Sequence, residues 1–174
     1  MTSPSNNDVQ RWTLLDRLPA GLWWRLLAVL VGAALVSMGA QITTPSGGEV
    51  PGTFQTLAVL VVGALLGPVF GTASVALYVL LGGLGAPIFA NGGSGFGGPT
   101  SGYFIGFIIA ALVVGLVSRR ACALPPNRAV PRLLVAMLLG LVAIYLGGLA
   151  WLVLRSGLSV GEALSAGFAP FIVG

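Results

Sequence analysis

The chain has 174 residues, of which 56% are hydrophobic and only 7% are charged, and its mean hydropathy is +1.01. Soluble domains usually carry about 25% charged residues, so this composition excludes an ordinary water-soluble globule. The sequence has no His, no Lys and a single Cys, which excludes imidazole-cysteine metal sites, Ser-His-Asp triads and lysine-dependent phosphate sites; its net charge of +4 comes entirely from arginine.

The first 20 residues are predicted to form a cytoplasmic tail and an interfacial helix. Residues 1–8 are polar, and VQRWTLLDRL after them alternates apolar and charged positions at helical spacing, as in a helix that lies in a membrane interface. Trp12, Trp23 and Trp24 fit an aromatic belt near lipid headgroups. Residues 21–174 are expected to form one membrane-embedded domain.

Span 1 is predicted from Gly21 to Ile42, and it carries small residues four positions apart. The two pairs are Ala28 with Gly32 and Ala33 with Ser37. Such spacing permits a close helix approach, either within this fold or against another subunit. Both alternatives predict that this face of span 1 packs against another helix.

Four further apolar segments follow span 1. Span 2 covers residues 54–66 and span 3 covers residues 69–83, with a tight uncharged turn at Gly67 and Pro68 between them. Both are short for independent spans, so we expect them to tilt or to be shielded by protein. Span 4 is predicted over residues 101–117 and span 5 over residues 133–154, joined by the basic loop SRRACALPPNRAVPR.

The arginines predict the orientation of these spans. Seven of the eight fall on one side of the membrane and only Arg155 falls on the other; the seven are Arg11, Arg17, Arg25, Arg119, Arg120, Arg128 and Arg132. This positive-inside bias puts the N-terminus in the cytoplasm, and it accounts for the pI of about 10.2 without a nucleic-acid partner. Three segments then emerge outside as irregular backbone, residues 43–53, 85–103 and 156–170. Long irregular loops are uncommon unless they are functional, so a ligand site is predicted on this face.

The central segment, GAPIFANGGSGFGGPTSGY, contains seven glycines, one asparagine and no charge. A phosphate cradle would need a preceding strand, a following helix and a lysine, which are missing. A flexible connector is one reading of the glycines. Asn91 and the aromatic residue of PTSGY favour a loop that closes over a neutral ligand with its main-chain N–H groups.

Some polar residues near the outer face have two readings. Gln55, at the outer start of span 2 with Thr53 and Thr56, is an uncharged donor and acceptor that could bind an amide or urea group; alternatively it is an interfacial residue bonded to water. Tyr78 and Tyr145 are either packing residues or ligand contacts. Glu49 and Glu162 are explained as solvated loop positions.

Residues 50–107 strongly resemble the BioY family, the biotin-binding membrane subunits of energy-coupling-factor (ECF) vitamin transporters. The matching pieces are VPGTFQTLAV, GALLGP, ALYVLLG, GAPIFA with the glycines after it, and GPTSGY. The GAQI end of span 1, the basic loop and FAPFI near the end also fit. The resemblance therefore covers most of the chain from Gly21 onward.

The resemblance implies an all-α integral membrane protein, a six-helix S-component bundle that binds biotin from outside the bacterial plasma membrane. It would be no enzyme and would use no cofactor or metal; its energy would come from an ECF transmembrane coupling protein and ATPase subunits. Loops 1 and 3 would cover the ligand. The positions implied to line the biotin site are Thr53, Gln55, Tyr78, Phe89, Asn91, Gly92, Gly93 and Tyr103. The small-residue face of span 1 would dock the coupling protein through Ala28, Gly32, Ala33 and Ser37.

Two departures from the family pattern affect this expectation. Typical members continue after a P-G pair with an aspartate and a lysine that begin the last helix, whereas this sequence ends with PFIVG, so we expect the sixth helix to be missing or truncated. PTSGY also replaces the usual PTGGY. The alternatives are a capture subunit for another small vitamin, or a truncated membrane protein without transport activity. A membrane enzyme would have only Asp8, Asp16, Glu49 and Glu162 as acidic groups.

Overall fold

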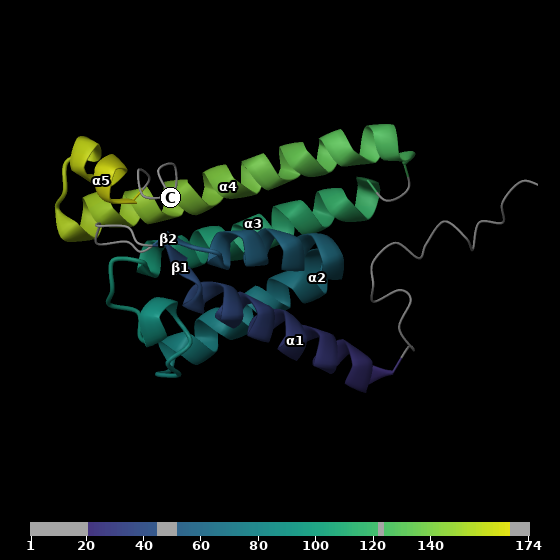
Figure 1. The fold of residues 1–174 in the computed structure, drawn as a ribbon, viewed down its shortest axis with the longest axis horizontal. Helices are drawn as coiled ribbons and strands as arrows, with labels where there is room; N and C mark the ends of the chain where they lie inside the picture. Colours follow the sequence, from purple (N-terminus) through teal and green to yellow (C-terminus); the bar gives the residue numbers. More distant parts are fainter. Residues whose placement is uncertain (1–20, 45–51, 122–123, 168–174) are drawn as a thin grey trace, which may run out of the picture.

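The computed structural model describes residues 21–44, 52–121 and 124–167, so the predicted tail and interfacial helix lie outside the described residues. The elements are α1 (Leu22–Gln41), β1 (Thr43–Thr44), β2 (Gly52–Thr53), α2 (Gln55–Gly83), η3 (Ala90–Gly92), α3 (Ser101–Ala121), α4 (Pro126–Ser156) and α5 (Val160–Gly167). Four of these helices, α1 to α4, are long and apolar enough to cross a membrane. The predicted all-helical membrane fold is therefore confirmed (Figure 1).

Helix α2 folds back on itself at Gly67. This residue has φ 74° and ψ −175°, outside the helical region, and Pro68 after it has no N–H to donate. A Cβ placed on Gly71 would lie 2.9 Å from the Cα of Gly63, whereas eight residues of straight helix span about 12 Å. The two arms of α2 therefore correspond to the predicted short spans 2 and 3, and the predicted turn lies between them (Figure 1).

Helix α1 packs closely on α2 through its small residues. Gly32 and Ala33 are buried, and a Cβ on Gly32 would lie 2.8 Å from the Cβ of Ser74 and 2.9 Å from a methyl of Leu66. The first alternative for the spacing in span 1, close approach within this fold, is confirmed. Ala28 and Ser37 are half-buried, and the docking role of the four residues stays a prediction.

The connection between α3 and α4 is shorter than the predicted basic loop. Helix α3 continues to Ala121 and α4 already begins at Pro126, so most of the predicted loop is helical. The physical reason is that Pro126 stands at the first position of α4, where its missing N–H needs no partner and its fixed φ suits the helix. Two of the prolines that suggested a loop, Pro125 and Pro126, therefore start a helix, and the third, Pro131, lies inside it.

The three outer segments predicted as irregular all contain some regular structure, which in the central one is η3 and the start of α3. Strands β1 and β2 pair antiparallel, with Thr43 opposite Thr53. Helix α5 starts with a capping box, in which the backbone N–H and the hydroxyl of Ser159 donate to Glu162 Oε2 at 2.8 and 2.7 Å. These hydrogen bonds lower the pKa of the Glu162 carboxyl. Glu162 is thus a helix-capping residue rather than a freely solvated position, and the S-x-x-E spacing was visible in the sequence.

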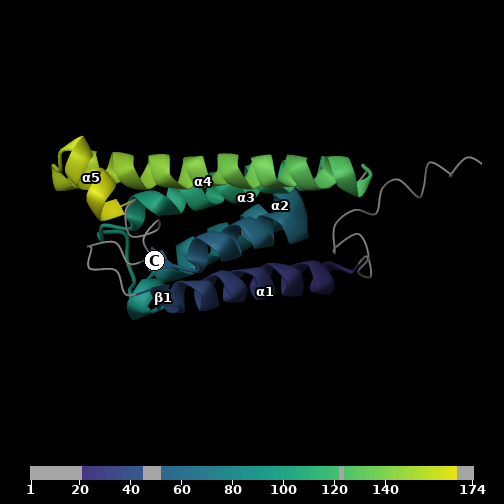
Figure 2. The ribbon, with the colours of Figure 1, turned by 45° about the horizontal axis from the view of Figure 1, so that its top comes forward.

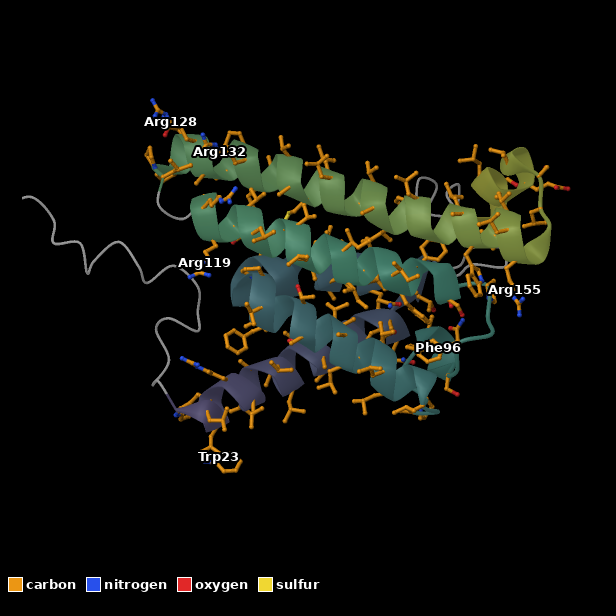
Figure 3. The ribbon with its side chains drawn as sticks, turned by 180° about the vertical axis from the view of Figure 1, so that it is seen from behind. Trp23, Phe96, Arg119, Arg128, Arg132 and Arg155 are labelled. Carbon is orange, nitrogen blue, oxygen red and sulfur yellow. The ribbon has the colours of Figure 1, made fainter. Side chains whose placement is uncertain are left out.

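The bundle has two chemically different ends. Arg119, Arg128 and Arg132 lie at the same end as Trp23, and Arg155 lies at the opposite end with Phe96 (Figure 3). Arg25 belongs to the first group, with its guanidinium 5.9 Å from the ring centre of Phe70, just after the turn in α2. We call this the basic end. The opposite end, the loop end, carries β1, β2, the segment 84–100 and α5 (Figures 1 and 2).

Candidate functional site at the loop end

The glycine-rich segment docks on the last turn of α2 through two phenylalanine rings. A Cβ on Gly82 would collide with the ring of Phe89, and a Cβ on Gly83 would collide with the ring of Phe96. The N–H of Gly95 also donates to the Gly82 carbonyl oxygen at 2.8 Å. The two glycines that end α2 therefore provide the surface on which the segment lies.

Phe89 joins this segment to an aromatic cluster in the core. Its ring centre lies 5.3 Å from that of Tyr78 on α2 and 4.3 Å from that of Phe104 on α3. The Phe104 ring is also 6.4 Å from Phe96 and 6.3 Å from Phe107. Residues of α2, the glycine-rich segment and α3 thus form one aromatic cluster at the loop end.

Several polar side-chain atoms are buried without a hydrogen-bond partner in the described part of the chain. They are Gln55 Nε2, Tyr78 OH and Ser101 Oγ, together with Thr72 Oγ1 further along α2. Leaving such a group unpaired costs about 1–3 kcal/mol, so native proteins keep few of them. Gln55 begins α2, Ser101 begins α3 and Tyr78 belongs to the aromatic cluster, so the first three groups lie toward the loop end. They are suited to bind an uncharged polar group of a ligand.

The structure brings together only some of the residues that the resemblance assigned to the site. Tyr78 and Phe89 are in contact, and Gln55 is buried at the start of the same helix as Tyr78. Thr53 is half-buried in β2. Tyr103 is directed elsewhere, because its hydroxyl donates to the carbonyl oxygen of Gly167 at 2.9 Å.

The remaining three assigned residues form the turn η3 and its end. Asn91 is exposed with φ 56°, and Gly92 follows with φ 72°. The prediction that main-chain N–H groups of this loop face a ligand is wrong for Gly92, Gly93 and Gly95. The N–H groups of Gly92 and Gly93 donate to the carbonyl oxygens of Phe89 and Ala90, both at 3.1 Å, because the loop folds into tight turns of its own, and that of Gly95 donates to Gly82 on α2 at 2.8 Å.

Sequence reasoning missed Gln41, Ser101 and Phe104. Gln41 Nε2 donates to the carbonyl oxygens of Ile88 and Phe89, and Phe104 packs on the Phe89 ring. A lone amide at the outer end of an apolar span was a usable signal for Gln41. Phe104 and Ser101 gave no such signal, since apolar and small residues fill every span.

The chemistry of the site is neutral and aromatic. The described residues contain no group of three or more His, Cys, Asp or Glu that could hold a metal ion. Aromatic rings with a few fixed amide and hydroxyl groups suit a small, largely apolar ligand that carries a neutral polar group.

Comparison with known proteins gives a consistent result. The profile of the BioY family matches residues 12–174. The probable biotin transporter BioY of Pyrococcus horikoshii is 41% identical over 151 residues, covering 85% of this chain and 83% of the relative. The biotin transporter BioY of Thermotoga maritima is 37% identical over 151 residues, covering 85% of each chain.

A solved structure has the same fold. It is the crystal structure at 2.1 Å of the S-component for biotin from an ECF-type ABC transporter, with a TM-score of 0.75. The likeness covers 98% of this chain and 86% of the other at 22% sequence identity, so it shows the fold. The S-component bundle predicted from the sequence is confirmed at this level.

Proposed function

The chain belongs to the BioY family, and from this premise we propose that it binds biotin in the membrane and mediates its uptake. The observation that supports the proposal is the set of buried, unpartnered groups of Gln55, Tyr78 and Ser101, of which Tyr78 belongs to the aromatic cluster.

The chemistry of biotin suits this site. Biotin has a planar neutral urea, an apolar thioether bicycle and a carboxylate tail. In our proposal the bicycle packs on Phe89 and Phe104, while the urea bonds to Gln55, Tyr78 and Ser101. Thr53, Asn91, Gly92 and Gly93 would border the ligand from the two loops, and Tyr103 would support the site through α5.

The loop end would face the outside of the bacterial plasma membrane, and the basic end would face the cytoplasm. The support is the position of Arg119, Arg128 and Arg132 at one end of the bundle (Figure 3), with Arg120 beside Arg119 in the last turn of α3 and Arg25 near Phe70. Uptake would be energised by a transmembrane coupling protein and ATPase subunits of the ECF type, because a binding subunit alone only equilibrates its ligand. In this assembly the chain itself would not act as an enzyme, and α1 would dock the coupling protein.

Equilibrium binding of labelled biotin to the purified chain in detergent tests the proposal. We expect saturable binding that unlabelled biotin displaces and that a panel of other vitamins does not. Displacement by another vitamin, with no effect of biotin, would reassign the subunit to that ligand. Binding of no vitamin, with association to coupling proteins retained, would leave an assembly role instead.

A further inference from the structure

The amide of Gln41 ties the end of α1 to the glycine-rich segment. Its Nε2 donates to the carbonyl oxygen of Phe89 at 2.9 Å and to that of Ile88 at 3.2 Å. We propose that Gln41 is a positioning residue for ligand binding: it holds Phe89 in the aromatic cluster and thereby keeps this segment closed over the ligand. The inference rests on the function proposed above.

The position of Phe89 depends on few other polar contacts of the segment. Its main-chain N–H donates to Gly93 O at 3.0 Å, a bond that lies within the segment and moves with it. The Gln41 bonds instead connect Phe89 to a helix of the bundle. Since the Phe89 ring reaches both Tyr78 and Phe104, a shift of this backbone moves the ring away from both partners.

The same end of α1 also holds the other half of the site. The carbonyl oxygen of Ile42 accepts a hydrogen bond from Phe54 N at 3.1 Å, and Thr43 pairs with Thr53. These contacts fix the residues directly before Gln55. Successive residues of α1 and β1 therefore hold the start of α2 on one side and the glycine-rich segment on the other. Loss of the Gln41 amide would loosen the Phe89 end of the segment, while the bond from Gly95 N–H to Gly82 O would still join the segment to α2.

The experiment compares Gln41→Leu and Gln41→Glu with the parent chain. Leu is one atom shorter than Gln and uncharged, whereas Glu keeps the length of the side chain and adds a negative charge; neither donates a hydrogen bond at neutral pH. Met38→Leu is the matched control, because Met38 is exposed one turn earlier on α1 and the change conserves volume. Half-buried Ala90, changed to Cys in a Cys122→Ser background, reports opening of the segment through its rate of thiol labelling without ligand.

Two hydrogen bonds of this kind correspond to about a tenfold change in the opening equilibrium. We expect both Gln41 variants to label Ala90→Cys about tenfold faster and to release bound biotin about tenfold faster, with the thermal midpoint close to that of the control. A general loss of stability would instead lower the midpoint of the Gln41 variants, so this readout separates positioning from folding.

The possible outcomes distinguish this inference from the proposed function. Unchanged labelling and unchanged biotin release in both Gln41 variants would overturn the inference while leaving biotin binding intact. A thermal midpoint of both Gln41 variants well below that of the Met38→Leu control would also overturn it, because Gln41 would then be a general structural residue. If the parent chain binds no biotin and the Gln41 variants still label faster than the parent, the positioning of Phe89 is supported and the proposed function is refuted.

Discussion

Replacing Gly106 with Val is expected to prevent α4 from packing on α3 and to abolish the folded bundle. A Cβ at this position would lie 2.5 Å from the Cα of Ile144 and 2.8 Å from the carbonyl oxygen of Ala143. Both are backbone atoms of α4, so only separation of the two helices relieves the contact. Membrane helices associate through close packing of small residues rather than a hydrophobic drive, and α4 rests chiefly on α3.

The expected cost exceeds the usual overpacking penalty of about 1–3 kcal/mol, because the opposing atoms belong to a helix backbone. The measurement is the yield of monodisperse protein on size exclusion in mild detergent, together with its thermal midpoint. Ile105→Val is the control, since the neighbouring Ile105 is exposed and faces away from α4. A Gly106→Val protein with the parent yield and midpoint would contradict the packing described here.

Replacing Gln55 with Leu is expected to weaken biotin binding without harming the fold. The Gln55 Nε2 is buried and unpaired, so an apolar side chain of similar shape removes a cost of about 1–3 kcal/mol from the unliganded protein. If the lost contacts to the ligand are worth the same free energy, biotin is expected to bind roughly tenfold to a hundredfold more weakly. Stability is therefore expected to stay equal or rise while affinity falls.

Thr72→Val provides the matched control for this experiment. Thr72 Oγ1 is also buried and unpaired on α2, but it lies outside the aromatic cluster that forms the proposed site. It should gain stability with unchanged affinity, as measured by thermal unfolding and titration of labelled biotin. If Gln55→Leu instead unfolds more readily and binds biotin as the parent does, Gln55 has a structural role.

The crossings of the membrane were predictable because they depend on local properties of the sequence. Long uncharged runs set the helices, and Gly67 with Pro68 marked the turn in α2. The start of α4 was not predicted, because proline is compatible both with a loop and with the first turn of a helix. The cap of α5 had a local signal, the spacing of Ser159 and Glu162, but Glu162 was interpreted only as a charged residue in a solvated loop.

The site was predictable only in part, because its contacts join distant parts of the chain. The resemblance identified Gln55, Tyr78 and Phe89, which the structure places toward the loop end. It could not show that the Tyr103 hydroxyl bonds to Gly167, since 64 positions separate the two residues. Nor could any pattern reveal that Gly82 must lack a side chain to receive the Phe89 ring.

Thiol labelling of Ser94→Cys in intact cells, in a Cys122→Ser background, tests whether the glycine-rich segment lies outside the membrane and closes over biotin. Ser94 is exposed in the glycine-rich segment at the loop end, so an impermeant reagent added outside should reach it. We expect the reagent to label Ser94→Cys from outside, at a rate that biotin lowers and other vitamins leave unchanged. Labelling only from the cytoplasmic side would contradict the orientation and the position of the site, and labelling from outside at a rate that biotin leaves unchanged would contradict closure of this segment over biotin.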